Sequence, residues 1–150
     1  MTIDEKVIST VIDCSKRFLL ATLMDSGLKL FNIKHHLGYS CKKYLPCFNT
    51  KNKINPTFGG VNNQMIAASH PETHQILIWD QKHSEPVAEL SGHKKFVNSV
   101  SWNPMLSEML VSASNDSSIK IWLSRNLNDQ FKSCESNAEQ IDSVSHCSSV

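Results

Sequence analysis

The sequence predicts an all-β protein made of repeated, antiparallel four-stranded sheets, and three observations lead to this fold class. Short runs of alternating apolar and polar residues recur along the chain, and Gly, Pro, Asn, Asp and Ser residues separate them. Three of these runs end near an aromatic residue, and the spacings from Phe31 to Trp79 and from Trp79 to Trp122 are 48 and 43 residues. Repeats of about 40–45 residues commonly hold four strands each. We therefore predict about three such repeats.

The first repeat is predicted at about residues 5–47. Its strands are expected at 7–14, 18–24, 28–33 and 41–47. A turn of Asp25, Ser26 and Gly27 separates the second strand from the third, and glycine suits it because glycine tolerates a positive φ.

The second repeat is predicted at about residues 56–91, with a weak first strand near 56–60 and clearer strands at 65–69, 75–80 and 86–90. Its third strand ends in the dipeptide Trp79-Asp80. The pair Gly59-Gly60 could suggest a phosphate-binding loop, but no Gly-Lys-Ser/Thr follows it. We expect a turn or close backbone packing there instead.

The third repeat, at about residues 92–123, is expected to have strands at 97–102, 109–114 and 118–122. Strict alternation in its first strand would place Val97, Ser99 and Ser101 on one face and Asn98, Val100 and Trp102 on the other. No fourth strand is predicted. Residues 124–150 are rich in Ser, Asn, Gln and charge without sustained periodicity, so we expect a disordered polar tail.

The third repeat contains the residue types of a buried polar network. His93 precedes the first strand, Ser112 (or Ser114) lies in the second, Asp116 lies in the next turn, and Trp122 ends the third. This arrangement resembles one blade of a WD40 β-propeller. In that family the Asp accepts from one His nitrogen, the other nitrogen meets the hydroxyl, and the indole N–H donates to the hydroxyl. The fold class implied is a partial WD40 propeller of about three blades.

The other two repeats carry less of this pattern. The second keeps Trp79 but lacks a Gly-His pair, and its turn offers Glu72 and Thr73 where an Asp would be expected. The first has Phe31 in place of the Trp. We expect these aromatic residues to close their blades through apolar packing.

A closer resemblance covers roughly residues 5–123. PVAELSGHKKFVNSVSWNP followed by MLVSASNDSSIKIW, and FGG, IAAS and ILIWD before them, are similar to the C-terminal repeats of the WD repeat-containing protein 26 family. This resemblance implies a scaffold subunit of the CTLH (GID) E3 ubiquitin ligase. The family supplies no catalytic residue. The partners implied are ligase subunits or substrate proteins, and the alternative is a WD40 adaptor of another assembly, in signalling or RNA processing.

Catalytic and metal-binding interpretations are weaker. Ser112, His93 and Asp116 could form a hydrolase triad, but no Gly-x-Ser-x-Gly motif is present and the blade explains their spacing. Cysteines 41 and 47 with histidines 35 and 36 match no common zinc module. We therefore expect neither an enzyme nor a metal, cofactor or small-molecule substrate.

A candidate partner contact is the loop segment Lys94-Lys95-Phe96, where an aromatic anchor stands beside two cations that could meet an acidic partner. The alternative, which we favour, is that Phe96 covers the edge of the blade and both lysines are solvated.

Composition narrows the partners and the compartment. The net charge is +1, and Arg17 and Arg125 are the only arginines, so nucleic acid is not expected as a partner. No apolar run approaches the roughly 18 residues of a membrane span, and the N-terminal residues do not resemble a signal peptide. Five cysteines without a C-x-x-C pair fit reduced thiols in the cytoplasm, with the nucleus as a second location.

Three blades are fewer than the roughly 4–8 of known propellers. Two sheet edges would stay open, and open edges favour pairing with another chain. We expect either a longer protein that completes the ring or self-association of copies through the open edges.

Overall fold

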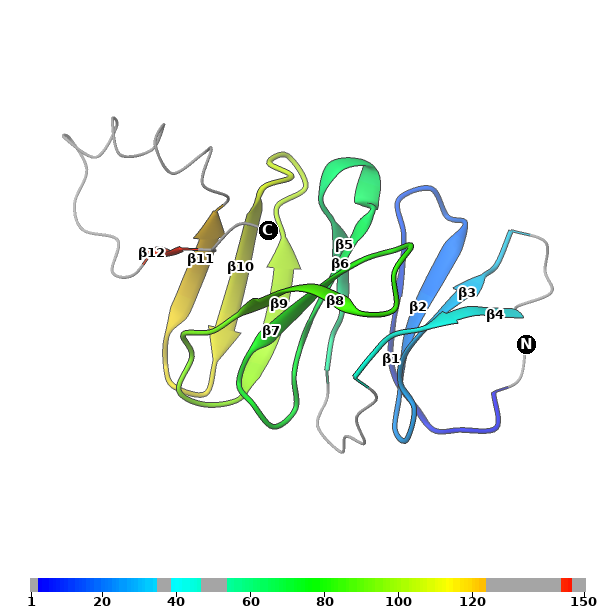
Figure 1. The fold of residues 1–150 in the computed structure, drawn as a ribbon, viewed down its shortest axis with the longest axis horizontal. Helices are drawn as coiled ribbons and strands as arrows, with labels where there is room; N and C mark the ends of the chain where they lie inside the picture. Colours follow the sequence, from blue (N-terminus) through cyan, green and yellow to red (C-terminus); the bar gives the residue numbers. More distant parts are fainter. Residues whose placement is uncertain (1–2, 35–38, 47–53, 124–143, 147–150) are drawn as a thin grey trace.

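The computed structural model describes residues 3–34, 39–46, 54–123 and 144–146, and these residues form three four-stranded sheets that stand side by side (Figure 1). The predicted all-β fold class is confirmed, since no α-helix occurs among the described residues. The elements of the first two sheets are β1 (Val7–Ile12), β2 (Phe18–Leu23), β3 (Gly27–Asn32), β4 (Tyr39–Lys43), β5 (Thr57–Gly59), the 3₁₀ turn η1 (Val61–Asn63), β6 (Met65–Ser69), β7 (Ile76–Asp80) and β8 (Pro86–Leu90).

The third sheet contains β9 (Val97–Trp102), β10 (Met109–Ser114), β11 (Ile119–Leu123) and β12 (Val144–His146). Neighbouring strands pair antiparallel in all three sheets, except that β12 runs parallel to β11. The sequence predicts no strand after β11, so β12 is an addition from the predicted tail. The rest of that tail lies outside the described residues.

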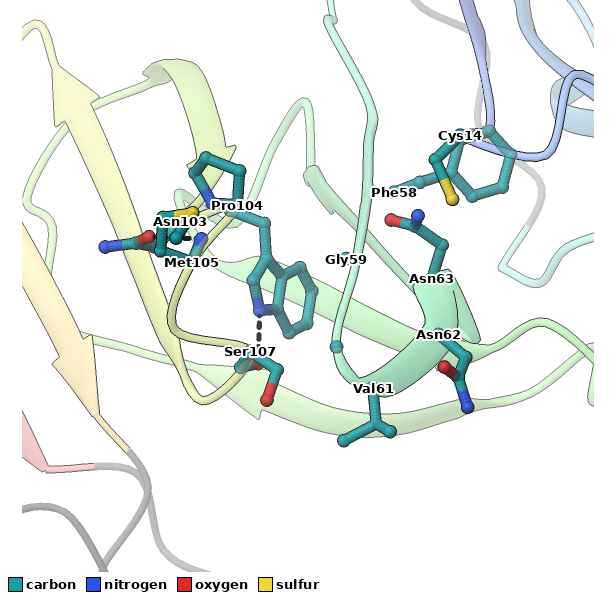
Figure 2. Close-up of a pocket in the computed structure, with 12 residues that line it drawn as sticks. Cys14, Phe58, Gly59, Val61, Asn62, Asn63, Asn103, Pro104, Met105 and Ser107 are labelled. Carbon is teal, nitrogen blue, oxygen red and sulfur yellow. Dashed lines mark hydrogen bonds between the residues drawn. The ribbon is translucent and has the colours of Figure 1, made fainter.

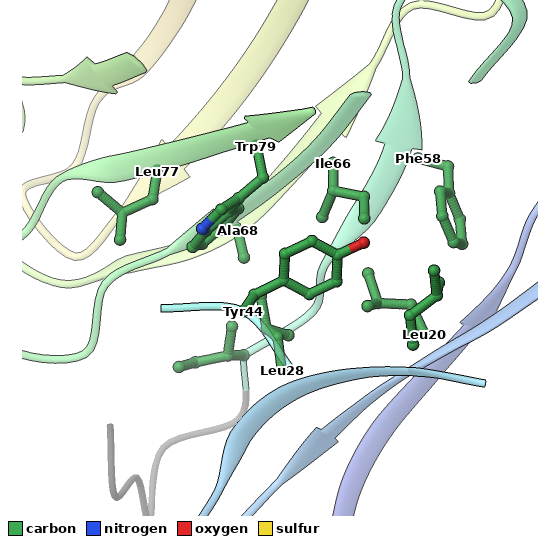
Figure 3. Packing of buried hydrophobic residues seen from close by; sticks show 10 residues of the cluster. Leu20, Leu28, Tyr44, Phe58, Ile66, Ala68, Leu77 and Trp79 are labelled. Carbon is green, nitrogen blue, oxygen red and sulfur yellow. The ribbon is translucent and has the colours of Figure 1, made fainter. Parts of the chain in front are cut away.

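The core lies between the sheets, because alternate side chains of each strand point to one face. Between the first and second sheets, apolar side chains surround Trp79 and Tyr44, whose ring centroids are 6.0 Å apart (Figure 3). Between the second and third sheets a second cluster includes Ile78, Leu110 and Trp122. Each sheet is thus stabilised mainly through a face shared with its neighbour.

The fourth strand of the first sheet differs from its prediction. We expected 41–47, whereas β4 begins at Tyr39 and ends at Lys43. The chain leaves the sheet here because Tyr44 is fully buried in the first core cluster and its hydroxyl donates to the carbonyl of Gln81 at 3.0 Å. Cys47 lies outside the described residues.

The predicted alternation of β9 is wrong at its start. Val97 pairs with Ser114 while Ser99 pairs with Ala113, so Asn98 is an extra residue that forms a β-bulge. The bulge turns Val97 onto the face of Val100, and both are buried in the second core cluster.

Candidate functional site

The end of the third sheet at the β10–β11 turn holds a polar network built from two strands, the turn between them and the segment before β9. His93 lies in the segment before β9, and Asp116 lies in the turn after β10. Ser112 in β10 and Trp122 in β11 point to the same face of the sheet, because Leu110 pairs with Trp122 and Ser112 lies two residues beyond Leu110. The structure therefore brings together four residues, the first and last of which are 29 residues apart in the sequence.

The distances identify a continuous chain of hydrogen bonds. The Trp122 indole N–H donates to Ser112 Oγ at 2.8 Å, and Ser112 Oγ lies 2.8 Å from His93 Nε2. His93 Nδ1 lies 3.0 Å from Asp116 Oδ2. Because indole can only donate, the serine hydroxyl is free to donate to Nε2, which leaves the Nδ1 proton for the Asp116 carboxylate. Each buried side-chain polar atom of this hydrogen-bond network has a partner.

The structure decides between the two serines of β10 and adds a third. Ser112 occupies the network, whereas the Ser114 hydroxyl donates to the carbonyl of Lys95 at 3.0 Å and accepts the N–H of Asp116 at 3.2 Å. Sequence reasoning missed Ser118, whose hydroxyl donates to Asp116 Oδ1 at 2.6 Å and lies 3.2 Å from His93 Nδ1. The signal was available, since a serine two residues after an aspartate is typical of a side-chain-bonded turn.

Asp116 is stabilised as a carboxylate. The Ser118 hydroxyl and the backbone N–H of Lys94 hold the pKa of Asp116 well below its usual range, against a smaller opposing effect of desolvation. A carboxyl group whose pKa is lowered by folding stabilises the native state above its ordinary pKa near 4, and this contribution is lost as the pH falls through the lowered value.

We therefore expect the Asp116→Asn variant to show a weaker loss of stability on acidification than the wild-type chain. Urea midpoints of both proteins, measured from pH 6 down to pH 3, test this. Glu108→Gln, at an exposed position in the β9–β10 turn, is the control and should show the same acid dependence of stability as the wild type. Equal acid dependence of Asp116→Asn and wild type would contradict the role given to this carboxylate.

In the second sheet, different residues hold the β6–β7 turn and bond the tryptophan indole. Its β6–β7 turn is held by His70, whose Nδ1 accepts the N–H groups of Glu72 and Thr73 at 3.2 Å. Trp79 is 1% exposed, and its indole N–H donates to the carbonyl of Leu45 at 2.7 Å, across the interface with the first sheet. In this sheet the tryptophan therefore ties two sheets together instead of capping a polar network.

The remaining predicted residues have separate locations. Phe31 is 5% exposed in a third apolar cluster on the far face of the first sheet. Lys94 and Lys95 are exposed, whereas Phe96 is half-buried against the core between the first two sheets. This placement matches the favoured interpretation, in which Phe96 covers the blade edge, and leaves the two lysines as the accessible part of the loop.

The hydrolase triad weighed from the sequence does not have an accessible nucleophile. Ser112 is 1% exposed and its oxygen is engaged by both Trp122 and His93, so a substrate cannot reach it. Within the ranges that the structure describes, no three His, Cys, Asp or Glu side chains lie together as a metal site. Residues 35, 36 and 47, whose spacing matches no common zinc module, fall outside those ranges. The described residues also contain no helix with the length and hydropathy of a membrane span.

Comparison with known proteins agrees with this geometry. Residues 84–122 match the family model described as WD domain, G-beta repeat. The chain is 36% identical over 111 residues, or 74% of its length, to the WD repeat-containing protein 26 homolog of Drosophila melanogaster, and this match covers 17% of that protein. The chain belongs to the WD40 repeat proteins of the WD repeat-containing protein 26 family.

Two further similarities complete the comparison. GID complex subunit 7 of Schizosaccharomyces pombe is 26% identical over 81% of this chain, which covers 24% of that subunit. The solved structure titled Structure of U3-55K aligns with a TM-score of 0.66 at 14% identity, over 82% of this chain and 37% of that one, and shows the fold alone. The chain spans about a fifth of the length of the curated relatives it matches.

Membership in this family explains the buried network. WD40 repeat proteins are generally non-catalytic scaffolds for protein interaction. The network between His93, Ser112, Asp116 and Trp122 fixes the loops at one end of the blade, because a fully bonded polar network specifies one geometry. The site thus positions a surface and leaves the contact with partners to exposed residues.

Proposed function

We propose that this WD40 protein acts as a non-catalytic scaffold in a CTLH/GID E3 ubiquitin ligase, where it holds ligase subunits or substrate proteins for ubiquitin-dependent degradation. The single observation that carries the proposal is the 36% identity to a WD repeat-containing protein 26 homolog over 74% of the chain. The similarity to GID complex subunit 7 supports it. We place this role in the cytoplasm, and also in the nucleus.

Affinity purification of the tagged, natural full-length product from its own cells tests this function. We expect ligase subunits to be enriched over a tag-only control, and mass spectrometry identifies them. The Ser112→Ala variant, which breaks the buried network, should lose these partners, whereas Ser99→Ala at an exposed position should keep them. Recovery of signalling or RNA-processing factors in their place would favour the alternative adaptor role.

Self-association is a second part of the proposed behaviour. The sequence predicts it through open sheet edges. In the third sheet β12 pairs along the edge of β11, and we add the exposed face of that sheet as a surface for association. On the outer face of the third sheet Ile119 is 65% exposed and Val111, Ala113 and Ile121 are half-buried, so aliphatic surface faces solvent. An exposed apolar face of this kind is expected to pack against another apolar surface.

Sedimentation velocity of the purified 150-residue chain should show dimers or larger species. Ile119→Lys should shift them toward the monomer, while Val61→Lys, at an equally exposed site in a turn, should not. A folded wild-type monomer would contradict self-association.

A further inference from the structure

A cavity lies at the opposite end of the sheets from the His93 network. The β1–β2 turn, η1 and the β9–β10 turn all lie at this end, at the top of Figure 1. Between them is a pocket of about 580 Å³, within the range of about 300–1,000 Å³ usual for ligand sites. Figure 2 shows Pro104, Met105 and Ser107 on one side of the pocket and Cys14 and Phe58 on the other. Trp102 and Gly59 also line it.

The floor of this pocket is rigidly built. Trp102 lies against the backbone of Gly59, and its indole N–H donates to the carbonyl of Ser107 at 2.6 Å. Asn103 holds the next turn, because its side-chain oxygen accepts the N–H groups of Met105 and Leu106. The turn that carries Met105 is therefore positioned before any partner arrives.

The rim combines exposed aliphatic groups with free amides. Val61 is 64% exposed and Met105 is 87% exposed, and both line the pocket. Asn62 and Asn63 also line it, and their side chains form no hydrogen bond with another residue of the described ranges. Both have φ near 55°, and Gly60 before them has a φ of 70°. Consecutive left-handed residues other than glycine are uncommon and occur preferentially at functional sites.

The lack of charged side chains in the lining indicates which kind of ligand fits the pocket. None of the 12 lining residues carries a formal charge, although charged residues such as Lys16 and Glu108 stand in the same turns. A charged ligand group would lose water here without an ionic partner, which is unfavourable. An uncharged aliphatic side chain would bury Val61 and Met105, and the amides of Asn62 and Asn63 can bond the peptide groups beside it.

We propose that this pocket docks an uncharged, aliphatic segment of a partner polypeptide. The proposal goes beyond the scaffold function above, because it holds whichever assembly the chain joins. It also places a contact surface at the opposite end of the sheets from the Lys94-Lys95-Phe96 loop.

The exposed free thiol of Cys14 lines the pocket and allows a direct test. The probes are acetyl-Gly-Leu-Gly-cysteamine and its counterparts with Glu, Lys or Gly in place of Leu. Each probe is used as its mixed disulfide with 2-mercaptoethanol. The Cys14 thiolate attacks the probe sulfur and releases 2-mercaptoethanol, so capture under a fixed excess of that thiol reports non-covalent affinity. Mass spectrometry of the peptide containing Cys14 separates this cysteine from the other four.

We expect capture of the Leu probe at least fivefold above the Gly probe, and capture of the Glu and Lys probes at or below it. Val61→Glu and Met105→Glu should bring the Leu-to-Gly ratio close to one, whereas Val7→Glu, at an exposed site at the start of β1, should leave it unchanged. The ratio to the Gly probe removes any change in thiol reactivity, and circular dichroism verifies the fold of each variant.

Equal capture of the Leu and Gly probes, stronger capture of a charged probe, or an unchanged ratio in both rim variants would overturn the proposal. The assay uses no ligase subunit. Its failure is therefore distinguishable from a failure of the co-purification experiment.

Discussion

Replacing Ser112 with alanine is expected to lower the free energy of unfolding by about 2–6 kcal/mol, because two buried groups lose their partner at about 1–3 kcal/mol each. Ser112 is 1% exposed, and its oxygen is bonded to both the Trp122 indole and His93 Nε2 at 2.8 Å. Alanine leaves both nitrogens in the interior without hydrogen bonds. Urea denaturation followed by circular dichroism measures the change.

Two further variants separate this network effect from a general effect of serine removal. Ser99→Ala lies on the exposed face of β9 and should change the stability by no more than about 0.5 kcal/mol. Adding Trp122→Phe to Ser112→Ala removes the orphaned indole donor and leaves only the His93 Nε2 acceptor unpaired, so the double variant should be more stable than the sum of the single losses predicts. A loss below about 1 kcal/mol for Ser112→Ala would show that the network contributes little to stability.

Gly59→Ala is expected to cost about 3 kcal/mol, the upper part of the range for overpacking a well-filled site. A Cβ at Gly59 would lie 2.0 Å from Cγ and 2.5 Å from Cβ of Trp102. These atoms are next to the backbone of β9, and the indole is also held by its hydrogen bond to Ser107, so neither can move aside easily. The measurement is again the urea midpoint.

Gly92→Ala provides the matched control for this clash. Its Cβ would lie 3.3 Å from Trp122 Cη2, and its other near neighbours are the end of the flexible Lys120 side chain. We expect a loss below about 1 kcal/mol there. Combining Gly59→Ala with Trp102→Val should recover stability relative to Gly59→Ala alone, because the indole is then absent. Equal losses for the two glycine variants would refute the steric explanation.

Local sequence patterns predicted most strands, because a two-residue alternation of apolar side chains is a property of each segment by itself. The strands β6 and β10 begin and end at the predicted residues. Where the prediction of a strand failed, a contact with a residue distant in the sequence determined the local structure. The end of β4 depends on Tyr44 entering a core shared with the second sheet, and the bulge at Asn98 depends on two valines that both pack against that sheet.

The polar network and the pocket differ in the same way, because only the network could be predicted from local sequence. The types and order of His93, Ser112, Asp116 and Trp122 are complementary in donors and acceptors, so the network was predictable before any coordinates. The pocket around Trp102 was not, since its lining comes from three turns separated by about 40 residues each. Gly59-Gly60 was the one local sign of close packing, and nothing in the sequence indicated that its neighbour is Trp102.

By itself, the sequence determined that this protein is all-β, that its units repeat, and that its third unit carries a WD40 polar network. Alternation, turn residues and hydrogen-bonding capacity are local and readable along the chain. Only the tertiary structure decided that Ser112 serves the network while Ser114 binds the Lys95 carbonyl. It alone brought Cys14, Gly59 and Trp102 around one cavity. These outcomes depend on how sheets pack against one another, which no single repeat encodes.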